Sequence, residues 1–338
     1  MQRDLYASIN EIELAANSSK FQRLKRNPWK YFFAISYRIF WYKLTLKSIK
    51  IASKTSWGDT MLLNLPAGTD IFLTGGKSDE SEIRLSKFIV SYLEEGGTFI
   101  DVGSHFGFYS LLASRCVCET GNVISIEASL ESFKILKINT ESYKNIKPIS
   151  FVVGAEERDI SFFEFPPLYS EYNTIFPEQF HNTSWFKKVK CTKRIIKMQT
   201  LDKLIEDEKI KPSMIKIDAE GSEFEIIKGL TNSLKKQMIP FICMEYLAAK
   251  RNNLNHVKAV AIMKSLGYNL KVINNNGNIE NCDDIEEYLN KKNIDSDNIV
   301  FSLKEWFLKG LSSLRGYSKI KILHLLDAGF FISILRKY

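Results

Sequence analysis

The central part of the chain alternates short, mostly apolar runs with longer segments in which apolar residues recur every three or four positions. A short apolar run is typical of a buried strand, and the longer spacing is typical of a helix that packs one face on a core. Strands are predicted at residues 61–65, 70–73, 99–102, 123–126, 149–153, 160–165, 214–217, 241–244, 268–273 and 299–303. Helices are predicted at residues 79–95, 109–115, 130–143 and 256–266, after Thr200 and after Glu223. The alternation predicts an α/β fold with a mostly parallel sheet of about seven strands.

The two ends of the chain and one internal segment follow other patterns. Residues 1–55 are predicted to be helical, with a break or a helix start at Pro28. Residues 304–338 are predicted to form an amphipathic helical tail, which leaves 56–303 as the main domain. Residues 166–189 are rich in polar and aromatic side chains and have no regular period, so they form either a lid or wall of a substrate site or an edge hairpin without a role in recognition.

Charge is distributed unevenly. The net charge is +8, yet residues 20–50 alone contain nine lysines or arginines and no acid, together with nine aromatic residues. The segment is too short and too often interrupted by charge to span a bilayer. It either lies on a membrane surface, with its cations against anionic lipid, or packs as an amphipathic helix on the main domain. No nucleic-acid-binding motif accompanies these cations, so nucleic acid is not expected as a partner.

Five scattered cysteines lack the spacing of a zinc site or a redox pair, and no signal-peptide layout is present. This pattern is typical of a protein of the reducing cytosol. The expected location is therefore the cytoplasm, with peripheral attachment at the inner face of the membrane as the variant that the basic segment suggests.

The chemistry begins at the turn that follows the strand at residues 99–102. This turn contains Gly103, His105 and Gly107, and glycines allow the backbone to approach a ligand closely. A dinucleotide fingerprint needs a glycine at the position of His105, so pyrophosphate binding is disfavoured. An acid on the strand, Asp101, followed by spaced glycines instead resembles motif I of class I S-adenosylmethionine-dependent methyltransferases.

A second acid, Glu127, ends the strand at residues 123–126 and stands where that class binds the ribose hydroxyls. A carboxylate at a strand end can accept hydrogen bonds from two vicinal hydroxyls. The alternative is that Asp101 and Glu127 only cap helices. The predicted cofactor-binding residues are Asp101, Gly103, His105, Gly107, Glu127, Gly154 and Ala155.

A further acidic run, Asp218-Ala219-Glu220-Gly221-Ser222-Glu223, follows the strand at residues 214–217. A carboxylate can take the proton of an attacking hydroxyl, and carboxylates together can hold a divalent ion that lowers the pKa of that hydroxyl. Asp218 and Glu220 are therefore the predicted catalytic residues, and whether a metal takes part is left open. The alternative is that both acids cap the next helix, and His105 is a weaker candidate for the base.

These motifs together closely resemble the FkbM family of methyltransferases. The resemblance covers about residues 60–303, and its most specific part is the run from Ile215 to Glu223. It implies a class I, Rossmann-like methyltransferase fold, S-adenosylmethionine as methyl donor, and O-methylation of a hydroxyl on a sugar, a glycan or a related natural product. If the basic segment at residues 20–50 lies on a membrane, the expected acceptor is a membrane-associated glycan, which includes lipid-linked forms. One departure is Ala128, where the family commonly has proline after the acid. A catalytically inactive cofactor-binding or membrane-associated scaffold is the alternative, and a nicotinamide-dependent oxidoreductase is disfavoured by the missing glycine.

Overall fold

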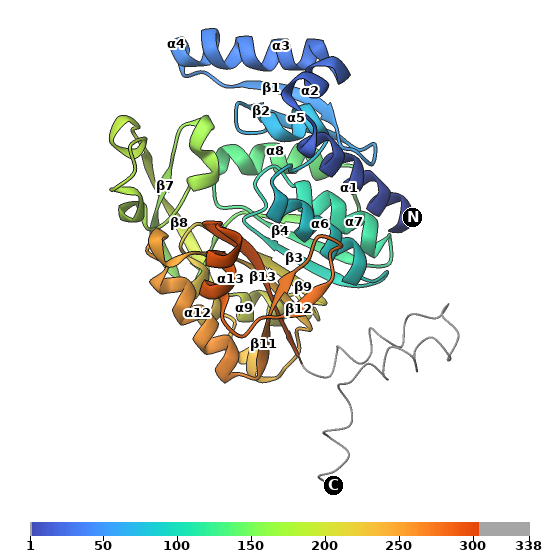
Figure 1. The fold of residues 1–338 in the computed structure, drawn as a ribbon. Helices are drawn as coiled ribbons and strands as arrows, with labels where there is room; N and C mark the ends of the chain where they lie inside the picture. Colours follow the sequence, from blue (N-terminus) through green and yellow to red (C-terminus); the bar gives the residue numbers. More distant parts are fainter. Residues whose placement is uncertain (1, 304–338) are drawn as a thin grey trace, which may run out of the picture.

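The computed structural model describes residues 2–303, so the predicted helical tail at 304–338 lies outside the described residues. Its centre is an eight-stranded sheet in the order β12-β11-β13-β10-β9-β3-β4-β5, with helices on both faces (Figure 1). The strands of this sheet are β3 (Thr98–Val102), β4 (Asn122–Ile126), β5 (Ile146–Ile149), β9 (Met214–Ile217), β10 (Phe241–Leu247), β11 (Tyr268–Ile273), β12 (Ile279–Asn281) and β13 (Ser296–Leu303). The helices of this part are α6 (Glu80–Tyr92), α7 (Phe108–Val117), α8 (Leu130–Thr140), α9 (Leu201–Asp207), α10 (Glu223–Lys228), α11 (Thr231–Lys235), α12 (Leu254–Ser265) and α13 (Ile285–Lys292).

The strand directions confirm the predicted mostly parallel α/β sheet. Five neighbouring strands, β10, β9, β3, β4 and β5, each pair in parallel with the next one. β13 lies between β10 and β11 and runs antiparallel to both. The eighth strand is the short β12, which pairs antiparallel with β11. It escaped the sequence-based prediction because it has no apolar run.

Successive residues of the central strands point into two separate hydrophobic cores. Phe99 packs with the core under α1 (Gln2–Asn17), α6 and α7, whereas its neighbour Ile100 packs with the core under α9 to α13. On β9, Met214 packs in the same core as Phe99, and Ile215 packs in the same core as Ile100. Because side chains alternate across a strand, a continuous apolar run means that both faces of the sheet are covered.

The strand predicted at residues 149–153 is in fact two strands. β5 ends at Ile149 in the main sheet, and β6 (Val152–Val153) pairs instead with β8 in a three-stranded sheet, order β6-β8-β7. The other members of this sheet are β7 (Arg158–Glu164) and β8 (Thr192–Gln199). β8 was not predicted, because most of its side chains are exposed and it lacks an apolar run. The segment between β7 and β8 contains only the short 3₁₀ turns η2 (Pro167–Tyr172), η3 (Pro177–Phe180) and η4 (Phe186–Lys188).

The N-terminal part is helical only as far as Thr45, and two predictions here were wrong. Residues 49–54, expected to be helical, form strand β1, which pairs antiparallel with β2. Residues 70–73, expected to form a strand, lie in a helix that ends at Gly75 in the left-handed conformation. So short an apolar run has no period that separates helix from strand. The elements are α1 (Gln2–Asn17), α2 (Lys20–Arg26), α3 (Pro28–Ser36), η1 (Tyr37–Tyr42), α4 (Lys43–Thr45), β1 (Ile49–Lys54), β2 (Thr60–Leu65) and α5 (Thr69–Thr74).

Element η1 is a π-helix, in which hydrogen bonds span five residues instead of four. Tyr37 and Tyr42 lie five residues apart, and both are buried. In an α-helix this spacing would place the two rings on different faces, whereas the wider turn allows both to point inward. The predicted division at residue 55 stays a prediction, and the β1–β2 pair crosses it.

Candidate active site

A cavity of about 430 Å³ lies at the carboxyl ends of β3, β4 and β9. In an open α/β sheet this edge is where ligands bind. The volume lies in the range of sites for small molecules and cofactors. Gly103, His105, Glu127, Asp218 and Glu220 all line this one cavity, so the structure brings together five of the nine residues predicted from the sequence.

The turn after β3 comes very close to the loop after β9. Gly103, His105 and Gly107 have φ values of 75°, 49° and 90°, in the left-handed region. A β-carbon at Gly103 would lie 1.8 Å from the carbonyl oxygen of Asp218. Only glycine therefore allows the predicted cofactor turn and the predicted catalytic loop to meet at this point.

Glu127 is held in place by two backbone N–H groups at the end of β4. Its carboxylate accepts hydrogen bonds from His105 N at 2.8 Å and from Ser129 N at 2.7 Å. Burial raises the pKa of Glu127 to about 7, although both hydrogen bonds act in the opposite direction. The carboxylate is thus fixed at the cavity wall and has remaining lone pairs with which to accept hydroxyl groups.

Asp101 lies beneath the cavity and does not line it. The residue is completely buried, accepts a hydrogen bond from the Ser110 hydroxyl at 2.6 Å, and forms an ion pair of 3.6 Å with Lys216. These contacts favour a role in holding Lys216 and the turn, so direct contact between Asp101 and a cofactor stays a prediction.

Gly107, Gly154 and Ala155 also lie outside the lining of the cavity. A β-carbon at Gly107 would meet the Leu136 side chain at 2.8 Å, and one at Gly154 would meet Met198 Sδ at 2.3 Å. Both glycines therefore allow close packing between elements. The cavity wall in this region is formed by the preceding residues, 151–153.

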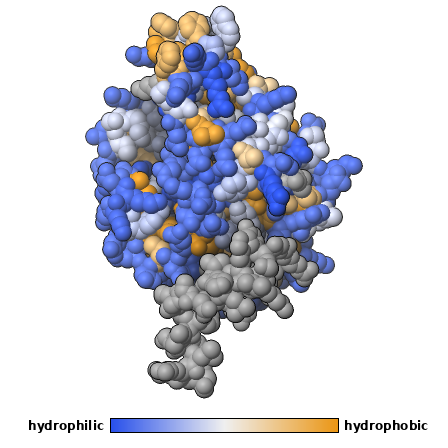
Figure 2. Space-filling view, turned by 45° about the vertical axis from the view of Figure 1, so that its right-hand side comes forward, coloured by the Kyte–Doolittle hydropathy of each residue, from blue (hydrophilic) through white to orange (hydrophobic). Residues whose placement is uncertain are grey.

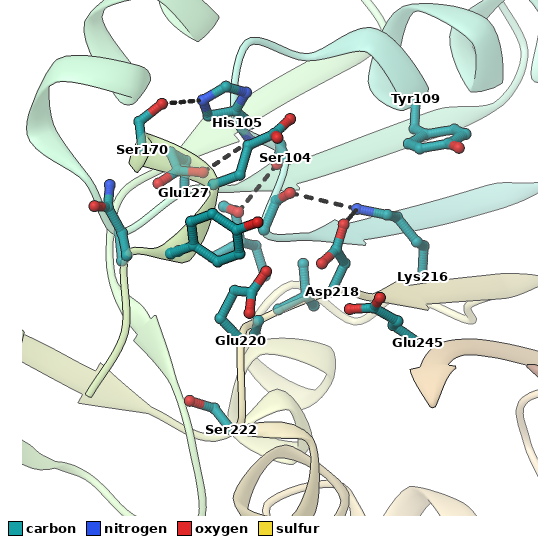
Figure 3. A pocket seen from close by; sticks show the side chains of 18 of the residues that line it. Ser104, His105, Tyr109, Glu127, Ser170, Lys216, Asp218, Glu220, Ser222 and Glu245 are labelled. Atoms are coloured by element: carbon teal, nitrogen blue, oxygen red, sulfur yellow. Dashed lines mark hydrogen bonds and ion pairs between the residues drawn. The ribbon is translucent and has the colours of Figure 1, made fainter. Parts of the chain in front are cut away.

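Three carboxylates converge on the other side of the cavity (Figure 3). Oxygen atoms of Asp218, Glu220 and Glu245 all lie within 4.8 Å of one another. Asp218 also contacts the ammonium group of Lys216 at 3.0 Å. Helix α10 begins at Glu223 with Ser222 as its N-cap, so neither Asp218 nor Glu220 caps it. Three oxygen donors this close are the ligands that Mg²⁺ or Ca²⁺ prefers, and the same group can accept a proton.

The acidic group is electrostatically unusual. Burial and the nearby charge of Asp218 raise the pKa of Glu245 to about 8. Burial and the neighbouring carboxylates also raise the pKa of Glu220. Glu220 has a φ of 39°, a conformation that a non-glycine residue adopts only at a cost, and its carbonyl accepts a hydrogen bond from Thr174 Oγ1 at 2.7 Å. Strained backbone and raised pKa values are both concentrated at functional sites.

The opposite wall contains residues that the sequence reasoning missed. Lys77 forms an ion pair with Glu171, and the Tyr109 hydroxyl donates to Glu82 at 2.8 Å. Burial lowers the pKa of His105 to about 4, so the ring is neutral near pH 7 and is a weak base. In the sequence, only the irregular segment at residues 166–189 indicated such a wall. Residues 170–175 of this segment line the cavity. Trp185 packs instead against the rings of Tyr169 and Tyr172.

Comparison with known proteins found a matching family and a curated relative. The family description "Methyltransferase FkbM domain" matches residues 101–270. The hexuronic acid methyltransferase AglP of Haloferax volcanii is 28% identical over 174 residues, which are 50% of this chain and 62% of AglP. The match thus spans less than two thirds of that relative.

Solved structures of low sequence identity were also found. An O-methyltransferase from Bacillus cereus in complex with SAH is 11% identical, with a TM-score of 0.36, over 65% of this chain and 80% of that one. The precorrin-6y C5,15-methyltransferase of Geobacter metallireducens is 12% identical, with a TM-score of 0.35, over 66% of this chain and 88% of that one.

Proposed function

Because the chain belongs to the FkbM methyltransferase family, we propose that it is an S-adenosylmethionine-dependent O-methyltransferase. Its acceptor in this proposal is a hydroxyl of a sugar, a glycan or a related natural product. The observation that carries the proposal is that one cavity contains both an oriented carboxylate suited to a ribose, Glu127, and a separate acidic group suited to an acceptor hydroxyl.

The residues of the cavity fit the cofactor that the family implies. Glu127 offers a carboxylate with free lone pairs, and Ile126 and Phe151 offer an apolar wall for an aromatic base. The turn from Gly103 to Phe106 lines the same cavity, and its N–H groups at Gly103 and Ser104 donate to the Ile126 carbonyl, which fixes the turn beside Glu127. When bound, S-adenosylmethionine supplies a methyl group activated by a sulfonium.

The chain's own residues would act on the acceptor. An alcohol is a poor nucleophile while it keeps its proton, so Asp218 or Glu220 accepts that proton as the new C–O bond forms. Lys216 balances the charge of Asp218 at 3.0 Å and positions it. Glu245 completes the acidic group, and the three carboxylates could instead hold a divalent cation against the hydroxyl.

The acceptor class is supported by the similarity to AglP, which is described as a hexuronic acid methyltransferase. A sugar carries several hydroxyls, and the cavity wall carries polar side chains such as Tyr109, Glu82 and Asn173 that can orient them. We place the reaction in the cytoplasm because all five cysteines are free, which suits a reducing compartment.

Calorimetric titration with S-adenosylmethionine, S-adenosylhomocysteine and NAD tests the cofactor. We expect heat with the first two and none with NAD, and the reverse would contradict the proposal. Incubation with methyl-labelled S-adenosylmethionine and a panel of sugars, including hexuronic acids and glycans, then tests the reaction, with the label followed into the sugar. Cofactor binding without any label in a sugar would favour the alternative of an inactive scaffold.

A further inference from the structure

The outer surface of residues 21–47, here called the docking layer, exposes far more apolar side chain than the rest of the described chain. Trp29 and Leu44 are each 82% exposed, and Phe40 is 68% exposed. Figure 2 shows hydrophobic residues gathered among hydrophilic ones at the top of the molecule, in the part that Figure 1 labels α3 and α4. The large exposed apolar residues of the layer are Phe21, Leu24, Trp29, Phe32, Phe33, Ile35, Ile39, Phe40, Trp41, Leu44 and Leu46.

The inner side of the docking layer is firmly attached, so this exposure does not come from loose packing. Tyr37 donates a hydrogen bond to the carbonyl of Leu65 at 3.3 Å, and Lys30 donates to the carbonyl of Phe72 at 2.9 Å. Ala34, Tyr37 and Tyr42 are buried. The protein thus holds a defined helical surface with its apolar side chains facing outward.

The charge of the layer identifies what it would contact. Arg26, Arg38 and Lys43 are exposed, and no acid occurs between Glu13 and Asp59 in the sequence. A second copy of the chain would bring the same cations against each other. A nucleic acid would use the cations but not the exposed aliphatic side chains. Exposed aromatic and aliphatic residues interspersed with cations match the headgroup region of an anionic bilayer.

We propose that the docking layer binds the protein peripherally to an anionic lipid bilayer. Among residues 2–303, no helix is long and apolar enough to cross a membrane, so the contact is one of surface attachment. Cations would lie near the lipid phosphates, and the tryptophan and phenylalanine rings would enter the interface.

The layer also touches the wall of the cavity. The hydroxyl of Tyr42 accepts a hydrogen bond from Leu168 N at 3.1 Å. Leu168 belongs to η2, which contributes Ser170, Glu171 and Tyr172 to the cavity lining. The bilayer therefore lies next to the cavity wall, and the acceptor class becomes a lipid-linked glycan. This second step rests on the proposed function, whereas the binding to lipid does not.

Co-sedimentation with vesicles tests the binding. The full-length protein should pellet with vesicles of phosphatidylglycerol and phosphatidylcholine at low salt, and be released as salt screens the charges. The quadruple variant Lys25→Gln, Arg26→Gln, Arg38→Gln, Lys43→Gln should lose more than tenfold in partitioning, because each cation near an anionic surface contributes about fivefold. Lys30 is left intact because it donates to the Phe72 carbonyl.

A matched control removes four exposed cations elsewhere. The variant Lys187→Gln, Lys188→Gln, Lys190→Gln, Lys193→Gln lowers the net charge by the same amount and should pellet like the wild type. A third variant, Trp29→Ser, Phe40→Ser, Leu44→Ser, should also lose at least tenfold while its affinity for S-adenosylhomocysteine stays unchanged, which shows that the fold is kept.

Three results would overturn the proposal. The first is a wild type that stays in the supernatant with vesicles at low salt. The second is a control variant whose vesicle partitioning falls as much as that of the docking-layer variant. A dimer that forms in solution and is broken by the Trp29, Phe40 and Leu44 substitutions would assign the surface to a second copy. Methylation of soluble and lipid-linked acceptors at equal rates, with vesicle binding intact, would overturn only the step that names a lipid-linked acceptor.

Discussion

The ammonium group of Lys216 lies 3.0 Å from a carboxylate oxygen of Asp218, at the centre of the sheet. Lys216 is only 3% exposed, and the same ammonium also faces the buried Asp101 at 3.6 Å. Burial lowers the pKa of Lys216, but the charges of Asp218 and Asp101 outweigh it and raise the pKa overall. One buried cation therefore balances an acid beneath the cavity and an acid that lines it.

Replacing Lys216 by methionine should destabilise the protein by about 3–5 kcal/mol, because it leaves the buried Asp101 carboxylate without its counter-charge. Urea denaturation near pH 7 measures the loss. Lys211→Met, at an exposed position, is the control and should change stability by less than about 0.5 kcal/mol. The double variant Lys216→Met, Asp101→Asn should recover part of the stability, and no recovery would contradict the pairing with Asp101.

The affinity for S-adenosylhomocysteine should rise as the pH increases through about 7. In the free protein Glu127 keeps its proton up to that pH, above its ordinary value of 4.5. Between pH 4.5 and about pH 7 Glu127 keeps its proton in the folded state but has lost it in the unfolded state. The free energy of unfolding therefore falls as the pH rises through this range. Ribose hydroxyls favour the ionised carboxylate. Titrations at pH 6, 7 and 8 should therefore show increasing affinity in the wild type and a flat profile in Glu127→Gln. The same slope in both proteins would remove Glu127 from the cofactor site.

Asp218→Asn should leave the affinity for S-adenosylhomocysteine nearly unchanged but reduce turnover by about 10²- to 10⁴-fold, because an amide cannot accept the acceptor's proton. Single-turnover methyl transfer is the measurement, and Asp207→Asn, at an exposed position in the last turn of α9, is the control. Normal turnover in Asp218→Asn would exclude it as the base. Loss of wild-type activity on chelation, with recovery on adding Mg²⁺, would instead assign the acidic group to a bound cation.

Gly103→Ala should damage both stability and activity. A left-handed alanine costs about 1–2 kcal/mol, and the added β-carbon would collide with the Asp218 carbonyl, which adds about 1–3 kcal/mol of overpacking. Gly58→Ala separates the two effects, since Gly58 has a φ of 97° but no atom within 4 Å of its missing β-carbon. Thermal unfolding should show a larger loss for Gly103→Ala, and an equal loss in both variants would contradict the close approach.

The sequence predicted the central sheet well because both of its faces are covered. A strand such as β9 is then apolar on both faces apart from Lys216, and the acid directly after it, Asp218, lies at the ligand edge. Elements outside this sheet were predicted less well. β8 exposes most of its side chains, and α5 is too short to show a period. In both cases contacts with distant parts of the chain decide the conformation, so the local sequence pattern does not predict it.

The sequence predicted those residues of the candidate site that come directly after a strand or within its following loop. Glu127, Asp218 and Glu220 each follow a strand and line the cavity. Glu245, expected at the ligand edge after the strand at residues 241–244, also lines the cavity, although β10 continues to Leu247. Lys77 and Glu171 meet across 94 positions of sequence, and no local pattern indicates that contact. Asp101 and Gly107 fit the motif in sequence, but both lie outside the cavity lining, so their contact with a cofactor stays a prediction.

The π-helix at residues 37–42 behaves as an α-helix with one additional residue. If Ile39 were deleted, Tyr37 and Tyr42 would stand four positions apart, which in an ordinary α-helix places both rings on the same inward face. The attachment of this helix to the protein therefore does not require the extra residue. What the insertion changes is the outward side, where it adds one more exposed apolar side chain between the two anchoring tyrosines. A shortened helix would keep its anchors and lose only part of the surface that it presents.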